Sequence, residues 1–105
     1  MENKYYYEVV LKAIYEAGDK GVTSYRIWKD IEAGSWSSVE KWALMLQTLG
    51  YVKMKIERMH KYSTRFRRIY FITEKGKELF DENGEIKEKK KKVLDAIFGA
   101  KNVKK

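Results

Sequence analysis

The sequence predicts an α+β fold that is mainly helical, with a two-stranded ribbon and a C-terminal helix. Two observations carry this prediction. Apolar residues recur at helical spacing through most of residues 4–49 and again near the C-terminus. Between these regions, two runs within residues 51–72 alternate apolar and polar side chains and are joined by a basic loop. Such alternation is typical of two paired strands with one solvated face.

The first helix is expected over residues 4–17. One apolar face is formed by side chains at helical spacing, namely Tyr6, Val10, Ala13, Ile14 and Ala17. Tyr7 and Leu11 widen this stripe, and Tyr5 and Val9 widen it further. So broad a stripe exceeds what one core contact needs, so we expect Tyr5 and Val9 to contact a partner chain as well. The Gly18–Gly21 segment ends the helix.

A short strand at residues 22–23 and a second helix at residues 25–31 are expected next. Thr23 or Ser24 is the candidate N-cap, because a hydroxyl oxygen there can accept a backbone N–H of the first turn. Ile27, Trp28 and Ile31 are spaced to form the core face of this helix. The turn that follows spans residues 33–35.

The third helix, residues 35–49, is predicted from its start signal and its periodicity. Ser37 followed by Glu40 fits a capping box, and Gly50 supplies the stop. The core stripe consists of Val39, Trp42, Ala43, Leu46 and Leu49. The remaining face carries Ser38, Lys41, Met45 and Thr48.

The ribbon is expected to pair residues 51–57 with residues 67–72. Residues 51–72 carry seven basic side chains and only one acidic one, so the positive charge is concentrated here. Residues 87–105 form a second basic segment. Of Arg67 and Arg68, which point in opposite directions on a strand, only one is expected to face a ligand.

Two interpretations of the C-terminal third are open. Thr73 can cap a helix from Glu74 to about residue 82, with a break at Asn83 and Gly84 and a further helix over residues 85–98 that ends at Gly99. Alternatively, residues 74–98 form one long helix with a weak heptad seam of Leu79, Asn83, Ile86, Lys90, Val93 and Ile97. The expected organisation is residues 1–82 as the main domain, 83–100 as a dimerisation helix and 101–105 as a basic tail. The predicted interface adds Ile86, Val93, Leu94 and Ile97 to Tyr5 and Val9.

Composition narrows the classes of function. A chain of 105 residues, 44% of them hydrophobic, fits one domain with its own core. Cysteine is absent, which excludes disulfides and thiolate chemistry, and one histidine gives little basis for a catalytic triad. We therefore expect no enzyme, no cofactor and no metal site. The net charge is +8, which predicts binding to a polyanion rather than to a membrane. The sequence shows neither a long apolar run nor a signal peptide, so we expect a cytoplasmic, nucleoid-associated protein.

Two sequence steps match a known family most closely. They are Leu49-Gly-Tyr-Val52, which joins the third helix to the ribbon, and Ile72-Thr-Glu-Lys-Gly76, which ends the ribbon. Over residues 5–80 the chain resembles the winged helix-turn-helix transcriptional regulators of archaea, their viruses and bacteria, including the MarR-like and PadR-like groups. The resemblance implies a homodimer on double-stranded DNA. It places helix 35–49 in the major groove and the wing, residues 57–67, on the backbone and minor groove.

The candidate DNA-binding residues follow from this placement. Serine hydroxyls and free N–H groups at a helix start can hold a phosphate, and lysine one turn further can reach a base or a phosphate. Arginine in a wing commonly enters a narrow minor groove. The candidates are Ser35, Trp36, Ser37, Ser38, Lys41 and Met45 on the helix and Arg58, His60, Lys61, Arg65 and Arg67 on the ribbon. For Trp36 a core position is the competing interpretation.

Helix 35–49 departs from the family pattern, in which this helix usually carries several basic or amide side chains for base readout. Here Lys41 and the distant Gln47 are the only such side chains. The first hypothesis is a homodimeric DNA-binding regulator, most simply a repressor, with any small-molecule effector left open. An architectural DNA-binding protein without sequence preference is the alternative, favoured by the poor readout helix and the basic tail. A protein–protein interaction module is the third hypothesis.

Overall fold

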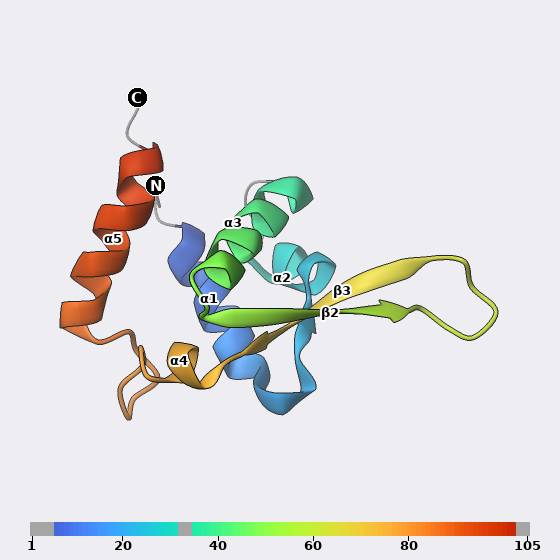
Figure 1. The fold of residues 1–105 in the computed structure, drawn as a ribbon, viewed down its shortest axis with the longest axis horizontal. Helices are drawn as coiled ribbons and strands as arrows, with labels where there is room; N and C mark the ends of the chain where they lie inside the picture. The colour runs from blue at the N-terminus through green and yellow to red at the C-terminus, as the bar shows by residue number, and fades with distance from the viewer. Residues whose placement is uncertain (1–5, 32–34, 103–105) are drawn as a thin grey trace.

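The structure is a computed structural model, and it describes residues 6–31 and 35–102. The fold is α+β, with helices outnumbering a small three-stranded antiparallel sheet (Figure 1). A single 3-10 turn at Gly18–Lys20 follows the first helix. In chain order the other elements are α1 Tyr6–Ala17, β1 Val22–Thr23, α2 Ser24–Ile31, α3 Trp36–Thr48, β2 Val52–Arg58, β3 Phe66–Ile72, α4 Glu74–Lys77 and α5 Glu88–Asn102.

The first three helices pack together through the faces that their periodicity predicts. Tyr7, Val10, Leu11 and Ile14 of α1 are fully buried, as are Ile27 of α2 and Ala43 and Leu46 of α3. Thr23 is confirmed as the cap of α2, because its Oγ1 accepts the backbone N–H of Arg26 at 3.1 Å. The predicted start of the first helix at residues 4 and 5 lies outside the described residues.

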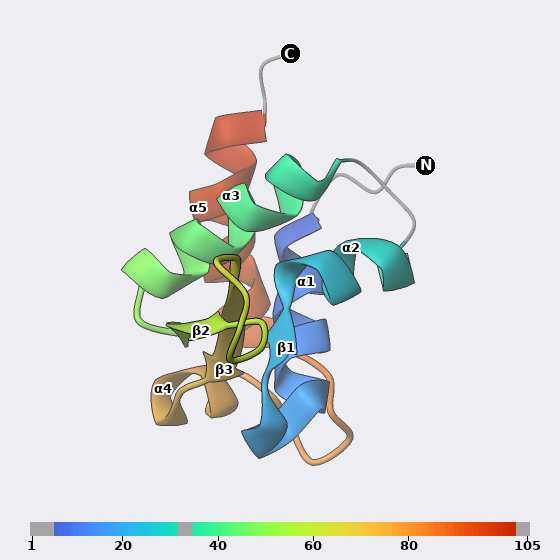
Figure 2. The same cartoon turned by 90° about the vertical axis from the view of Figure 1, so that its right-hand side faces the viewer.

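The sheet has the order β1-β3-β2, with the long β2–β3 hairpin projecting away from the helices (Figure 1). Val52 pairs with Ile72 and Arg58 with Phe66, so the two strands remain in register over their whole length. Seen along the hairpin, α3 lies on one side of these strands and α4 on the other (Figure 2). The short strand β1 pairs with β3 at Val22 and Tyr70.

The two sequence steps on which the family resemblance rests lie against each other. Thr73 donates its hydroxyl to the carbonyl of Gly50 at 2.7 Å, and its backbone N–H bonds the carbonyl of Tyr51 at 3.1 Å. The same hydroxyl caps α4 by accepting the N–H of Gly76. A Cβ at Gly76 would lie 2.1 Å from the backbone oxygen of Tyr51, so only glycine allows this approach.

The region after the hairpin differs from both predictions. Helix α4 is a single turn that ends at Lys77, not a helix to residue 82. A compact turn follows, in which the Asp81 carboxylate accepts the backbone N–H groups of Asn83 and Glu85. Gly84 adopts a φ of 79° in this turn, and Phe80 forms a bridge with Ile86. The long helix with a heptad seam is therefore wrong, because residues 78–87 are not helical.

Helix α5 starts at Glu88 and continues through Gly99 to Asn102, so the predicted stop at Gly99 is wrong. It buries Leu94 and Phe98 in the core, and the ring of Phe98 stacks on Tyr7 of α1 with centroids 4.3 Å apart. Asp95 accepts a hydrogen bond from the Tyr7 hydroxyl. The C-terminal helix thus completes the core formed by the earlier helices. Leu94 is 1% exposed, which removes it from the predicted interface.

Candidate nucleic-acid interface

The N-terminus of α3 is exposed and rich in serine hydroxyls. Ser35 has an extended backbone and caps the helix, accepting the backbone N–H of Ser38 at 3.1 Å. Its hydroxyl also lies 3.1 Å from the hydroxyls of Ser37 and Ser38. The predicted Ser37–Glu40 capping box is therefore wrong, because the cap lies two residues earlier and the Glu40 carboxylate bonds Ser24 and Arg68 instead.

The solvent-facing side of α3 differs slightly from the predicted one. Ser37, Lys41, Leu44 and Thr48 are spaced to share a face, and all four are exposed. Leu44 is 59% exposed, although it was not among the predicted contacts. Met45 is half-buried and packs on the core, so it is a poor candidate for a ligand contact. A periodicity of 3.6 places positions 44 and 45 on either side of the boundary between core and solvent, and local sequence alone does not separate them.

The strand register decides which hairpin arginine faces α3. Arg68 pairs with Ile56 on the face that also carries Tyr70, and its guanidinium lies 3.1 Å from the Glu40 carboxylate of α3. Arg67 is on the other face, where it forms an ion pair with Glu57 at 3.0 Å. Arg68 is therefore the arginine beside α3, whereas a DNA contact by Arg67 stays a prediction.

The tip of the hairpin, residues 59–65, is folded by its own hydrogen bonds. The backbone N–H of Met59 bonds the carbonyl of Arg65 at 3.0 Å, and His60 Nδ1 accepts the N–H of Tyr62 at 3.3 Å. The Arg58 guanidinium lies over the Phe66 ring at 5.7 Å and the Lys61 ammonium over the Tyr62 ring at 5.3 Å. Basic and aromatic side chains are thus interleaved on the exposed end of the hairpin.

Cations at this tip have no acidic neighbour to neutralise them. Within residues 6–31 and 35–102, the ion pairs do not include Arg58, Lys61 or Arg65. The second basic segment lies in α5, at the opposite end of the molecule from the hairpin (Figure 1). One of its lysines, Lys91, is 3.4 Å from the Glu8 carboxylate. The positive charge therefore forms two separate surfaces and not one continuous patch.

An apolar cleft lies between the hairpin and the starts of α2 and α3. It has a volume of about 550 Å³ and is lined by Thr23, Ser24, Tyr25, Trp36, Glu40, Ile56, Met59, Phe66, Arg67 and Arg68. Trp36 is 46% exposed, and its indole N–H donates to Ser24 Oγ at 2.9 Å. Trp36 therefore lies at the edge of a cleft and not in the core, which answers the question that its sequence position left open.

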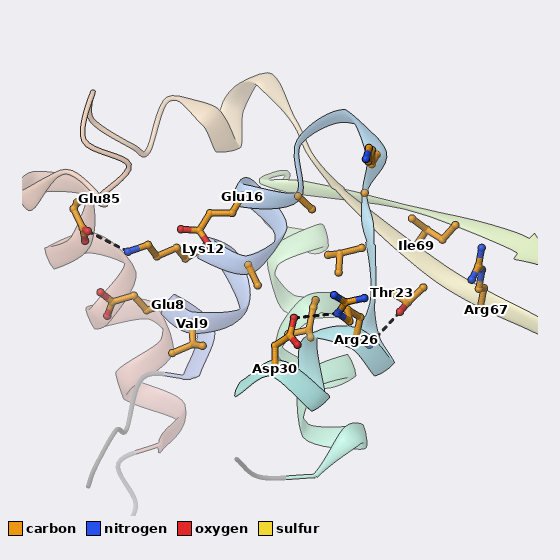
Figure 3. Close-up of a pocket in the computed structure, with 16 residues that line it drawn as sticks. Glu8, Val9, Lys12, Glu16, Thr23, Arg26, Asp30, Arg67, Ile69 and Glu85 are labelled. Carbon is orange, nitrogen blue, oxygen red and sulfur yellow. Dashed lines mark hydrogen bonds and ion pairs between the residues drawn. The ribbon is translucent and has the colours of Figure 1, made fainter. Parts of the chain in front are cut away.

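A second groove lies on the other side of α2, between α1, β1, α2 and β3 (Figure 3). Its lining carries four basic and four acidic side chains, and two pairs of these are in contact: Lys12 lies 3.1 Å from Glu85 and Arg26 lies 3.3 Å from Asp30. The hydrogen bond from Lys12 to Glu85 is the main cause that raises the pKa of this lysine. Because the acidic and basic side chains of the lining are equal in number, this groove offers no net charge to a ligand.

Three predicted interface residues are exposed, namely Val9, Val93 and Ile97. Ile86 is half-buried and packs on the chain's own core, and Tyr5 lies outside the described residues. Val93 and Ile97 are four residues apart and therefore share a face of α5. The exposed part of the predicted interface is thus narrower than the sequence indicated.

The described residues contain no cluster of three or more His, Cys, Asp or Glu side chains able to hold a metal ion. None of the helices in this part of the chain has the length and apolar character to cross a bilayer.

Comparisons with protein-family models, with curated proteins and with solved structures find no match for this chain. Functional inference therefore depends on the geometry of α3, the hairpin and the cleft between them.

Proposed function

We propose that this chain is a winged-helix DNA-binding protein that acts as a homodimeric transcriptional regulator, most simply a repressor. The observation that carries the proposal is the position of the uncompensated cations Arg58, Lys61 and Arg65 on a hairpin that projects beside the open N-terminus of α3. In this proposal α3 enters the major groove and the hairpin is the wing, which follows the backbone into the minor groove.

The order of elements supports the proposal. The family resemblance predicts a helix, a short strand, two further helices and a hairpin, which is the order that the structure has. The second strand of the hairpin also pairs with the short strand. The serine hydroxyls at the start of α3 are exposed, so they are available to DNA phosphates. The exposed Val9, Val93 and Ile97 side chains are candidates for the contact between protomers.

Selection from a pool of random-sequence duplexes, carried out at two salt concentrations, tests this proposal. A sequence-specific dimer is expected to enrich a palindrome whose half-sites lie about one helical turn apart, at roughly 34–36 Å. Its affinity should also fall steeply with salt, because binding releases counterions from the DNA. Failure to bind any duplex at low salt would contradict the proposal and direct the search to protein partners.

An architectural DNA-binding role is the second candidate, and the exposed face of α3 favours it. That face offers one charged side chain, Lys41, and the apolar Leu44, so it has few groups for reading base edges. In this case the same selection would yield salt-dependent binding without an enriched motif.

A further inference from the structure

The cleft between the hairpin and the starts of α2 and α3 exposes aromatic surface where the proposed DNA-binding face lies. Phe66 is 58% exposed on the hairpin side, opposite the half-exposed Tyr25 and Trp36 on the helix side. A volume of about 550 Å³ falls within the range of roughly 300–1,000 Å³ that is usual for small-ligand sites. Contiguous exposed apolar surface of this kind commonly marks a binding site.

The aromatic wall of the cleft is held in place by contacts of Trp36 with its neighbouring side chains. Trp36 packs edge-on against Tyr25 at 5.1 Å and parallel to Trp28 at 6.3 Å, both distances between ring centroids. Its indole N–H is fixed by Ser24, which is 3% exposed. A ring that is oriented before binding loses little conformational entropy when a second flat ring stacks on it.

One polar residue that lines the cleft, Glu40, can accept further hydrogen bonds. Glu40 accepts a hydrogen bond from the Ser24 hydroxyl at 2.9 Å and forms an ion pair with the Arg68 guanidinium at 3.1 Å. A carboxylate has about four acceptor positions, so Glu40 can accept further N–H donors. Its side chain is partly exposed. The Watson–Crick edge of an unpaired base presents such donors.

The positive charge of the hairpin beside the cleft indicates which class of aromatic ligand the cleft would bind. The Arg58 guanidinium lies over the ring of Phe66, which lines the cleft, and Lys61 and Arg65 follow on the hairpin tip. All three lie outside the ion pairs of the described residues. Aromatic surface bordered by cations is complementary to a base attached to a phosphate backbone. An apolar peptide side chain would use the rings and leave these cations without a partner.

We propose that this cleft binds one unstacked base of a DNA strand, between Trp36 and Phe66, while the hairpin cations contact the phosphates on either side. The inference rests on the proposed DNA binding and deepens it. Bases inside a continuous duplex are stacked and paired and do not reach the cleft. The protein is therefore expected to prefer DNA that carries an unpaired base over the same DNA fully paired.

A paired comparison tests the proposal. The protein is titrated against a fluorescein-labelled duplex with a single bulged 2-aminopurine, and against the matching duplex without the bulge, with anisotropy as the measure of affinity. Stacking of one base is expected to make the bulged duplex bind about tenfold more tightly, which corresponds to about 1.4 kcal/mol. The fluorescence of the 2-aminopurine should change on saturation, because its neighbours change from bases to protein rings.

The variant Phe66→Ala is expected to reduce this preference to less than about twofold while leaving the affinity for the paired duplex within about twofold. Tyr62→Ala is the matched control, since Tyr62 is another hairpin aromatic, 84% exposed, that does not line the cleft. The control should keep the full preference. Met59→Ala, a second change in the cleft lining, should reduce it in the same direction as Phe66→Ala.

The outcomes separate this inference from the function on which it rests. Equal affinity for bulged and paired duplexes, or a preference that survives Phe66→Ala, would overturn the base-binding cleft and leave the DNA-binding proposal intact. Absence of binding to either duplex at low salt would overturn both. Circular dichroism of each variant shows whether it is folded, and Phe66 and Met59 are both exposed enough for their truncation to preserve the core.

Discussion

Tyr70 joins the core of the sheet to the charged groups at the start of α3. Its ring is buried, and burial is the main cause that raises the pKa of its phenol, with the nearby Glu40 carboxylate raising the pKa further. Arg68 acts in the opposite direction. The neutral phenol is therefore the form that the fold favours.

This raised pKa predicts a loss of stability in alkali. The stabilisation is complete below the ordinary phenol pKa of about 10 and is lost as the pH rises through the higher pKa of the folded state. Urea unfolding between pH 8 and 11 should show a steeper alkaline fall for the wild type than for Tyr70→Phe. Lys12, whose pKa is also raised, is present in both proteins and cancels in the comparison. Parallel pH profiles would contradict the prediction.

Lys41 is the only charged side chain on the solvent-facing side of α3, so its replacement tests whether this helix reads bases. In a sequence-specific complex, Lys41→Ala is expected to weaken binding to the selected site by about 1–3 kcal/mol and to relax preference at one position. Lys53→Ala, an exposed lysine on the hairpin face away from α3, is the control. An equal loss on every sequence would assign Lys41 to a phosphate instead.

At the scale of elements, α5 carries two adjacent residues, Val93 and Leu94, that differ in burial. Leu94 is buried against the first helix layer, whereas Val93 is 55% exposed. Leu94→Ala is expected to lower the free energy of unfolding by about 2–5 kcal/mol, because it removes packed volume from the core. Val93→Ala should change it by less than about 0.5 kcal/mol. Denaturant unfolding at low protein concentration measures both changes.

The same pair of variants also tests the proposed dimer. If the exposed face of α5 contacts a second copy, Val93→Ala should weaken self-association in sedimentation equilibrium while leaving the unfolding of the protomer nearly unchanged. Similar unfolding losses for the two variants would mean that α5 does not dock in the way described. Unchanged self-association in Val93→Ala would move the interface away from this face.

Across the whole molecule, the two basic segments lie at opposite ends of a body whose longest extent is 46 Å. Their separation allows a test in which net charge is held constant. Arg58→Gln with Arg65→Gln removes two charges from the hairpin, and Lys89→Gln with Lys90→Gln removes two from α5.

The hairpin double variant is expected to lower the salt-dependence slope of DNA binding by about two units, because each phosphate contact contributes about 0.9. The α5 double variant should leave the slope nearly unchanged. Titrations of one duplex at several salt concentrations provide both slopes. Equal effects from the two variants would mean that net charge, and not the position of the hairpin, determines binding.

Local sequence was sufficient for the elements as far as the hairpin and for most of the faces that they bury, but not for the extents of the helices after it. Helical spacing identified the buried sides of α1 to α3, and alternation identified the two faces of the hairpin, since both patterns arise from backbone geometry over a few residues. The two segments on which the family resemblance rests, around Gly50 and Gly76, contact each other at the base of the hairpin and therefore contribute to the fold.

Only the tertiary structure decided how separate segments meet. Strand pairing and the approach of α3 placed Arg68 beside Glu40, and docking of α5 on the core buried Leu94. The turn around Asp81 ended the predicted helix early. The cleft combines residues from α2, α3 and the hairpin that are far apart in the chain. Periodicity records which side of an element is apolar, whereas the identity of the neighbour on that side is a property of the folded chain.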